Sequence, residues 1–201
     1  MATDSQWHDR VTASIGGSEN YGKGIDPNPW VSQMPEYQRR HEQMQLRQLL
    51  TRKIEMLTEP RFITCGETSE LMEALITMID ATQILELGMH TGRSTLHFLR
   101  AIVGKLGAQV VSIDARPAHD REFFKGFENR GYFQFIEGWT PQCLDQLAGR
   151  VFDFVFVDSD HSVEHTKNEL VALHKITRSG SMICFHDVPE WQTPSNRGIS
   201  A

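Results

Sequence analysis

Two glycines stand four residues apart directly after the apolar run 83–87. Gly88 and Gly92 let the backbone pass close to a ligand, because glycine has no side chain and tolerates left-handed backbone angles. The residues after Gly92 have the pattern of a helix, whose first N–H groups can receive a carboxylate. The stretch is therefore either an ordinary turn between a strand and a helix or a binding loop for a ligand that carries a carboxylate.

An acidic residue ends the next apolar run, 109–113. Asp114 lies 26 residues after Gly88, and a carboxylate at such a strand end can accept both hydroxyls of a ribose. The diphosphate fingerprint G-x-G-x-x-G is absent, because His90 stands where its second glycine belongs. The pattern favours a nucleoside cofactor without a diphosphate, and it argues against an NAD-binding oxidoreductase.

Carboxylates and imidazoles follow two later apolar runs, 152–157 and 181–185. They are Asp158, Asp160, His161, His186 and Asp187. If the two runs are neighbouring parallel strands, these side chains converge at one edge of a sheet, which is costly unless a cation or a shared proton offsets the charge. We predict a metal site. The alternative is a set of solvated loop acids with a helix cap from Asp160 or Ser162.

The elements that position these residues alternate between strand and helix. Short apolar runs bounded by turn residues predict five strands, at 83–87, 109–113, 132–136, 152–157 and 181–185. Helical stretches separate them near 93–105, 119–129, 141–148 and 162–176. Parallel neighbours need such crossovers, and their strands read as continuous apolar runs because both faces are covered. We predict an α/β fold with a doubly wound, mostly parallel sheet of five strands.

Two segments precede this pattern. Residues 1–34 show neither helical nor strand periodicity and predict an irregular N-terminal arm. Residues 35–60 predict an amphipathic helix, and 61–201 a single domain. The apolar stripe of that helix comprises Leu46, Leu49, Leu50, Ile54 and Leu57. Its opposite face carries mixed charges, which indicate a solvated surface, with a partner or anionic surface as the alternative.

Composition narrows the function classes. The chain has 201 residues and a formal net charge of −6, so it carries no broad basic surface and we expect no nucleic acid partner. No apolar run approaches the ~20 residues that cross a bilayer, and the first residues lack a signal peptide, so we expect a cytosolic protein. The three cysteines have no metal or disulfide spacing and are interpreted as buried thiols.

Three further histidines are not assigned to a functional site by the sequence. His97 and His174 have the positions of ordinary helix residues. His165 lies four residues after His161 and could share its helix face. We expect it to be exposed to solvent instead.

Residues from about 62 to 188 resemble a class I S-adenosylmethionine-dependent methyltransferase. The closest resemblance is to the catechol O-methyltransferase group and, still more, to the macrocin and rhamnosyl O-methyltransferases. The stretch from Glu86 to Thr95 has the motif E-x-G-x-x-x-G-x-S-T, and Asp114 matches the ribose acid of the family. Residues 152–161, with His186 and Asp187, match the metal loops after its fourth and fifth strands.

The resemblance implies a role for each residue near the cofactor. Glu86 belongs to the cofactor motif, Gly88 and Gly92 border the methionine moiety, Ser94 contacts its carboxylate, Asp114 holds the ribose, and Gly138 and Trp139 lie by the adenine. Trp139 equally fits a surface tryptophan on a loop. A branched side chain at Gly88 is then expected to block the cofactor with little harm to the fold.

The resemblance also implies a divalent metal ion, Mg or Mn, at Asp158, His186 and Asp187. Such an ion lowers the pKa of a substrate hydroxyl before the methyl transfer. His186 replaces an oxygen ligand of the catechol-type enzymes, so the metal identity stays open. Either His161 or Asp160 removes the proton, since relatives differ at this point.

The resemblance points to methylation of a small hydroxylated substrate, a sugar or a diol. Such enzymes continue past the fifth strand with a helix and an antiparallel hairpin, for which residues 189–201 are too few, so we expect the hairpin to be missing. The arm, the 35–58 helix or a second copy of the chain is then expected to cover the edge of the fifth strand. The alternative function is a methyltransferase-like binding or assembly module without turnover.

Overall fold

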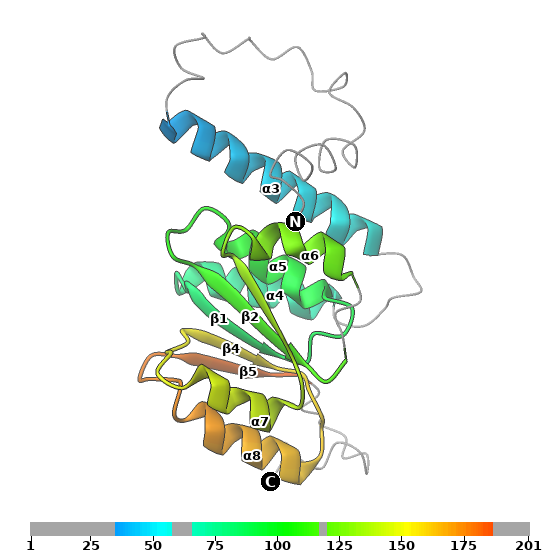
Figure 1. Ribbon diagram of the computed structural model, residues 1–201, viewed down its shortest axis with the longest axis vertical. Helices are drawn as coiled ribbons and strands as arrows, with labels where there is room; N and C mark the ends of the chain where they lie inside the picture. The colour runs from blue at the N-terminus through cyan, green and yellow to red at the C-terminus, as the bar shows by residue number, and fades with distance from the viewer. Residues whose placement is uncertain (1–34, 58–65, 117–119, 187–201) are drawn as a thin grey trace.

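The computed structural model describes residues 35–57, 66–116 and 120–186. Its centre is a five-stranded sheet in the order β3-β2-β1-β4-β5, in which every pair of neighbours is parallel (Figure 1). The strands are β1 (Gln83–Leu87), β2 (Gln109–Asp114), β3 (Phe133–Glu137), β4 (Phe154–Val157) and β5 (Met182–Phe185). The predicted fold class, including the number of strands and their parallel direction, is confirmed.

Successive strand residues pack into two different cores. Ile84, like its neighbours on β2 and β4, is buried among helices on one face, while Leu85 is buried on the other. Because side chains alternate across a strand and both faces are covered, the strands have no polar face to show in the sequence. This is why they appear there as continuous apolar runs.

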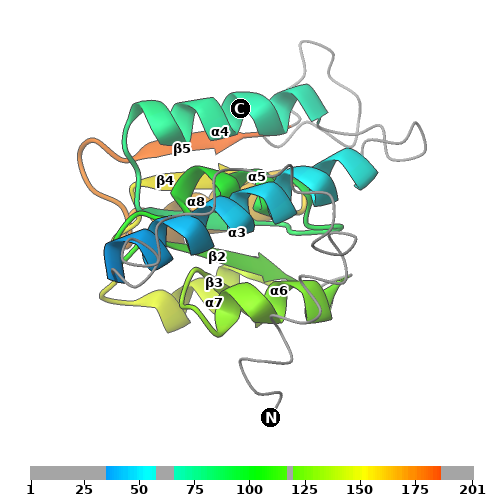
Figure 2. The same ribbon diagram turned by 90° about the horizontal axis from the view of Figure 1, so that it is seen from above.

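Helices cover both faces of the sheet, lying above and below it in Figure 1, and Figure 2 looks onto one of these faces. On one face lie α4 (Gly66–Met78), α5 (Arg93–Ile102) and α6 (Arg121–Glu128). On the other lie α7 (Thr140–Leu144), a short 3-10 turn, η3 (Asp145–Leu147), and α8 (Val163–Leu173). The helices α5, α6 and α8 lie within the stretches predicted from the sequence, and α7 begins one residue before its predicted stretch.

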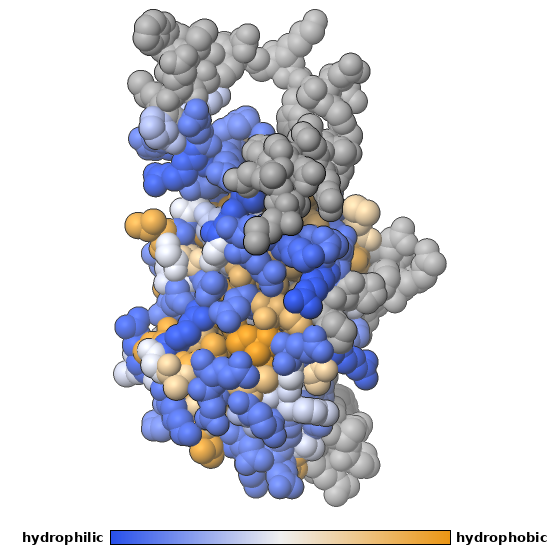
Figure 3. Space-filling model, viewed as in Figure 1, coloured by the Kyte–Doolittle hydropathy of each residue, from blue (hydrophilic) through white to orange (hydrophobic). Residues whose placement is uncertain are grey.

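The amphipathic helix, α3 (Pro35–Leu57), forms an additional layer over α5. Leu46, Leu49, Leu50 and Ile54 are buried, as the apolar stripe predicted. The charged side is largely exposed, and Figure 3 shows a mostly hydrophilic surface over this helix. Lys53 is an exception, since it pairs with Asp120 at the start of α6. The expectation that this helix covers the edge of β5 is wrong, because it packs on the helical layer.

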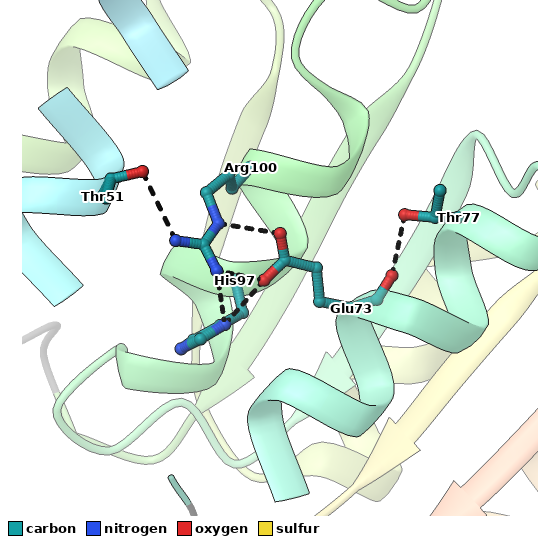
Figure 4. Close-up of polar contacts among 5 residues, drawn as sticks. All are labelled: Thr51, Glu73, Thr77, His97 and Arg100. Carbon is teal, nitrogen blue, oxygen red and sulfur yellow. Dashed lines mark hydrogen bonds and ion pairs between the residues drawn. The ribbon is translucent and has the colours of Figure 1, made fainter. Parts of the chain in front are cut away.

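A partly buried charge cluster joins α4 to α5 (Figure 4). Arg100 donates two hydrogen bonds to the carboxylate of Glu73, and the Nδ1 of His97 lies 2.8 Å from Glu73 Oε2. Burial acts to raise the pKa of Glu73, but the bonds from His97 and Arg100 outweigh it and hold the pKa below its usual value. His97 is therefore a buried structural residue of α5, which agrees with its interpretation as an ordinary helix residue.

The remaining sequence predictions concern the cysteines, the arm and the membrane. Cys143 is buried and Cys184 is half-buried, while Cys65 lies outside the described residues. The predicted arm, 1–34, and the segment after Asp187 also lie outside them. Among the helices that the structure describes, none is long and apolar enough to span a bilayer.

Candidate functional site

A cavity of about 490 Å³ opens at the carboxyl edge of the sheet. Its wall consists of the turns that follow β1 to β5, the first residues of α5 and α7, and one residue of α8. Segments far apart in the sequence therefore meet there, as expected at the switch point of a doubly wound sheet. The lining residues used below are Gly88, His90, Ser94, Asp114, Gly138, Trp139, Thr140, Asp158, Ser159, Asp160, His165 and His186. The structure thus brings the predicted site residues on the β1, β2, β3 and β4 ends to one place.

The turn between β1 and α5 depends on backbone angles that favour glycine. The φ angles are 92° at Gly88, 47° at His90 and 78° at Gly92. A Cβ added at Gly88 would lie 2.0 Å from the carbonyl oxygen of Asp158, which is a collision with backbone. The expectation that a larger side chain here leaves the fold intact is therefore wrong, since the turn packs directly on the β4 loop.

Glu86 lies beneath this turn and is completely buried. Its carboxylate accepts hydrogen bonds from Ser94, from Thr95 at 2.6 Å and from Ser112 at 2.5 Å. Burial raises the pKa of Glu86 to about 7, and the nearby negative charge of Asp158 adds to this rise. The three hydrogen bonds from the hydroxyls lower the pKa, but they do not outweigh the burial. The described cavity wall includes Ser94 but not Glu86, so Glu86 holds the wall from behind.

The acid at the end of β2 is fixed by backbone groups. One oxygen of Asp114 accepts the N–H of His90 at 2.8 Å, and the other accepts the N–H of Arg116 at 2.9 Å. A carboxylate oxygen has two acceptor sites, so Asp114 can still bind hydroxyls in the cavity. These two bonds fix its direction before any ligand arrives.

Gly138 and Trp139 follow β3 at the opposite end of the cavity wall. The N–H of Gly138 donates to the carbonyl of Asp114 at 2.8 Å, which holds the β2 and β3 turns together. Trp139 immediately precedes α7, and 60% of it is exposed. Trp139 lies at the rim of the cavity. Its position is therefore compatible both with a residue beside the adenine and with a surface tryptophan.

Two imidazoles approach one carboxylate at the end of β4. Asp158 Oδ1 lies 3.2 Å from the Nδ1 of His186 and 3.5 Å from the Nε2 of His161. This mixed set of nitrogen and oxygen atoms suits Mn, Fe or Zn as well as Mg. Within the described ranges, however, no three His, Cys, Asp or Glu side chains are spaced to hold a metal ion. The third predicted ligand, Asp187, lies outside those ranges.

Asp160 has the features of an exposed turn acid beside the cavity. Its Oδ1 accepts the backbone N–H of Ser162 at 2.7 Å, and this bond, with the Ser162 hydroxyl, lowers its pKa. This bond closes a turn just before α8, and the N-cap residue of that helix, Ser162, makes no side-chain cap bond, so the helix cap offered as the alternative is not formed. His161 lies partly exposed beside Asp158 and is outside the described cavity wall.

Sequence reasoning missed two residues of this site. His165 is only 15% exposed and lines the cavity, so the expectation of solvent exposure is wrong. Its Nε2 lies 3.1 Å from Glu169, one helical turn later, which is fully buried. The four-residue spacing was visible in the sequence, but such a pair usually lies on an exposed helix face.

Curated relatives share low but consistent similarity with the chain. A catechol O-methyltransferase from Mycobacterium tuberculosis is 27% identical over 132 residues, which are 64% of this chain and 58% of that protein. Catechol O-methyltransferase B of Danio rerio is 26% identical over 108 residues, 48% of this chain and 39% of that protein. The chain thus spans less than two thirds of the length of these relatives.

A solved structure supports the fold. The O-methyltransferase from Bacillus cereus, in complex with SAH, superposes with a TM-score of 0.60 at 20% sequence identity, covering 77% of this chain and 75% of that one. Residues 85–188, from β1 through β5 and including the whole cavity wall, match the family described as "Methyltransferase domain". These residues make up more than half of the chain, and the chain belongs to the methyltransferase-domain family.

Proposed function

We propose that this protein transfers a methyl group from S-adenosylmethionine to a hydroxyl of a small substrate, a sugar or a diol, with the help of a divalent metal ion. One observation carries the proposal. A glycine turn at Gly88, the fixed acid Asp114 and the pair of Asp158 with His186 all border a single cavity. The first two suit a nucleoside cofactor, and the third suits a reacting hydroxyl.

The cofactor would lie along the β1 and β2 ends of the cavity. Its methionine part would pass the turn at Gly88 and Gly92, where a side chain has no room, with its carboxylate near Ser94. Asp114 would accept the ribose hydroxyls, and the adenine would extend toward Gly138 and Trp139. The SAH held by the Bacillus cereus protein supports this choice of cofactor.

The acceptor hydroxyl would lie beside Asp158. Its oxygen attacks the methyl carbon of the sulfonium as the carbon–sulfur bond breaks, which gives a methyl ether and S-adenosylhomocysteine. Asp158, His186 and Asp187 would hold a divalent ion, which would lower the pKa of the substrate hydroxyl. His161 or Asp160 would take the proton. The lowered pKa of Asp160 weakens it as a base.

The test combines binding and turnover. Calorimetric titration with S-adenosylmethionine, with and without Mn²⁺ or Mg²⁺, should show cofactor binding, and NADH should not compete. Asp158→Asn should abolish both the response to the ion and methyl transfer to a panel of diols and sugars, while cofactor affinity stays within a few fold. Absence of cofactor binding in the parent would refute the proposal.

The proton acceptor can be separated from the metal. If His161 is the base, His161→Ala should lower turnover by about a hundredfold to ten-thousandfold, and Asp160→Asn should have a milder effect. The reverse order would assign the proton to Asp160. Cofactor and metal binding without turnover on any acceptor would instead favour the binding or assembly module.

A cytosolic location and a second copy of the chain along the edge of β5 stay predictions.

A further inference from the structure

A buried carboxylate lies under the cavity between α7 and α8. Glu169 has no exposed surface, and its Oε1 accepts hydrogen bonds from the hydroxyls of Thr140 and Ser159, the latter at 2.6 Å. The Nε2 of His165 lies 3.1 Å from the same oxygen. The other oxygen, Oε2, is buried and has no hydrogen-bond partner among the described residues.

The contacts of Glu169 all serve the cavity. Thr140, Ser159 and His165 each line it, and Glu169 itself lies behind them. Burying a carboxylate costs free energy that hydrogen bonds only partly offset, and here one oxygen is left without a partner. Because the bonds go only to wall residues, the arrangement fixes the orientation of the wall.

The hydrogen atoms in this network determine which nitrogen of His165 carries the proton. Thr140 has a single hydroxyl hydrogen, and it is donated to Glu169. The Thr140 oxygen can then only accept, so the Nε2 of His165, 2.7 Å away, must be the donor. In the neutral ring the Nδ1 is therefore an acceptor. It has no hydrogen-bond partner in the described part of the chain.

His165 lies at the end of the cavity that the adenine would occupy. Its ring contacts Trp139 edge to face, with the centroids 6.2 Å apart, and it bonds to Thr140, the next residue. Both residues directly follow Gly138. Because Nε2 is engaged by Thr140 and Glu169, Nδ1 is the ring nitrogen left to accept a bond from a ligand in the cavity that His165 lines.

We propose that His165 determines the base specificity of the site by accepting a hydrogen bond from the 6-amino group of adenine at Nδ1, and that Glu169 is the positioning residue that fixes the required tautomer. The inference rests on the proposed function, because it assumes the adenosyl cofactor. A site built around an acceptor rejects an analogue without the donor, since the acceptor is left unpaired.

The experiment compares two ligands by calorimetry, S-adenosylhomocysteine and S-inosylhomocysteine. S-inosylhomocysteine has a 6-oxo group in place of the 6-amino group. It would therefore place a hydrogen-bond acceptor opposite the Nδ1 of His165, which is also an acceptor. The parent should prefer S-adenosylhomocysteine by roughly ten- to a hundredfold. His165→Phe keeps an aromatic ring but removes the acceptor. The affinity for S-adenosylhomocysteine should then fall, the affinity for S-inosylhomocysteine should not fall, and the preference of the parent should disappear.

A second variant tests the tautomer. In Glu169→Gln the new amide can donate to Nε2, which moves the ring proton to Nδ1 and into the cavity. The preference should then shrink or reverse in favour of S-inosylhomocysteine. A role in packing alone would weaken both ligands equally in both variants, and that result would overturn the inference. If His165→Phe does not fold, the preference of Glu169→Gln between the two ligands decides whether the inference holds.

Controls come from the same helix region. Glu164→Gln and His174→Phe change exposed residues and should keep the preference of the parent. If the parent binds S-adenosylhomocysteine without discriminating against S-inosylhomocysteine, this inference fails and the cofactor assignment stands. If the parent binds neither ligand, the proposed function and this inference fail together.

Discussion

Glu86 and Glu169 are two fully buried carboxylates on opposite faces of the sheet, and both hold residues of the same cavity wall. Glu86 accepts only from hydroxyls, those of Ser94, Thr95 and Ser112. Glu169 accepts from hydroxyls and also lies beside an imidazole, that of His165.

The two sides of the wall are built differently. On the Glu86 side the turn itself is fixed by the backbone, because its φ angles are positive and a Cβ at Gly88 would meet the Asp158 carbonyl. On the Glu169 side, a network of side chains holds the wall. We expect substitutions in the first side to damage the fold and substitutions in the second to change what the cavity binds.

The largest expected effect is in the backbone-built turn. Gly88→Ala should lower the free energy of unfolding by about 4 kcal/mol or more, because it adds left-handed strain to a collision with backbone. Urea unfolding measures the loss. Gly107→Ala is the matched control, since Gly107 has a φ of 68° with nothing within 4 Å of the added Cβ. Equal losses in the two variants would show that the collision is relieved elsewhere.

The next effect concerns the pH dependence of stability. Between the ordinary pKa of 4.5 and the raised pKa of about 7, the folded protein keeps a proton on Glu86 that the unfolded chain loses. The free energy of unfolding should therefore fall as pH rises through this window, by about 3 kcal/mol from this group. Glu86→Gln cannot lose a proton and should lack that part of the slope.

Urea unfolding at several pH values checks this expectation. Glu137→Gln, at the exposed end of β3, should keep the slope of the parent. Parallel curves for the parent and Glu86→Gln between pH 4.5 and 7 would mean that Glu86 is already ionised in the folded protein.

A smaller effect is expected in the network built from side chains. Thr140→Val keeps the shape of the side chain but removes its bonds to Glu169 and His165. We expect a loss of about 1 to 2 kcal/mol in the free energy of unfolding, and a weaker preference between the two bases described above. Thr77→Val, exposed on α4 and bonded only to its own helix, should change stability by less than about 0.5 kcal/mol. An equal change in both would show that the network contributes nothing measurable.

The smallest effect should come from the rim. Trp139→Phe loses part of the edge contact with His165, but most of this side chain is exposed. Stability should change by less than about 0.5 kcal/mol, whereas the affinity for S-adenosylhomocysteine should fall by about two- to fivefold. Thermal unfolding and calorimetry measure the two quantities. A stability loss as large as that of Thr140→Val would place Trp139 in the network.

Sequence reasoning could predict most of the fold because its signals are local. Buried parallel strands are apolar runs, and glycines such as Gly88 and Gly92 mark turns, so β1 was predicted to the residue and the others to within two. The cavity wall of Gly88, Ser94, Asp114 and Asp158 followed from the rule that strand ends meet at one edge.

The parts that could not be predicted depend on contacts across the fold. Nothing local distinguishes Glu169 from an exposed helical glutamate, because its burial arises from Thr140, which lies 29 residues away on another helix. The contact of His97 with Glu73 was not predictable for the same reason, since Glu73 belongs to α4. The collision at Gly88 required the position of the β4 backbone.

The layer formed by α3 has a consequence for the order of folding. This helix precedes every strand, yet its contacts reach Val103, Asp120 and Arg130, with separations of up to 88 residues. Loops of that length close late, since their entropy must be paid before the contacts form. During synthesis α3 leaves the ribosome before the described strands, and we expect it to dock after they have formed the sheet. Until then its leucines and the side of α5 that it covers stay exposed to other chains.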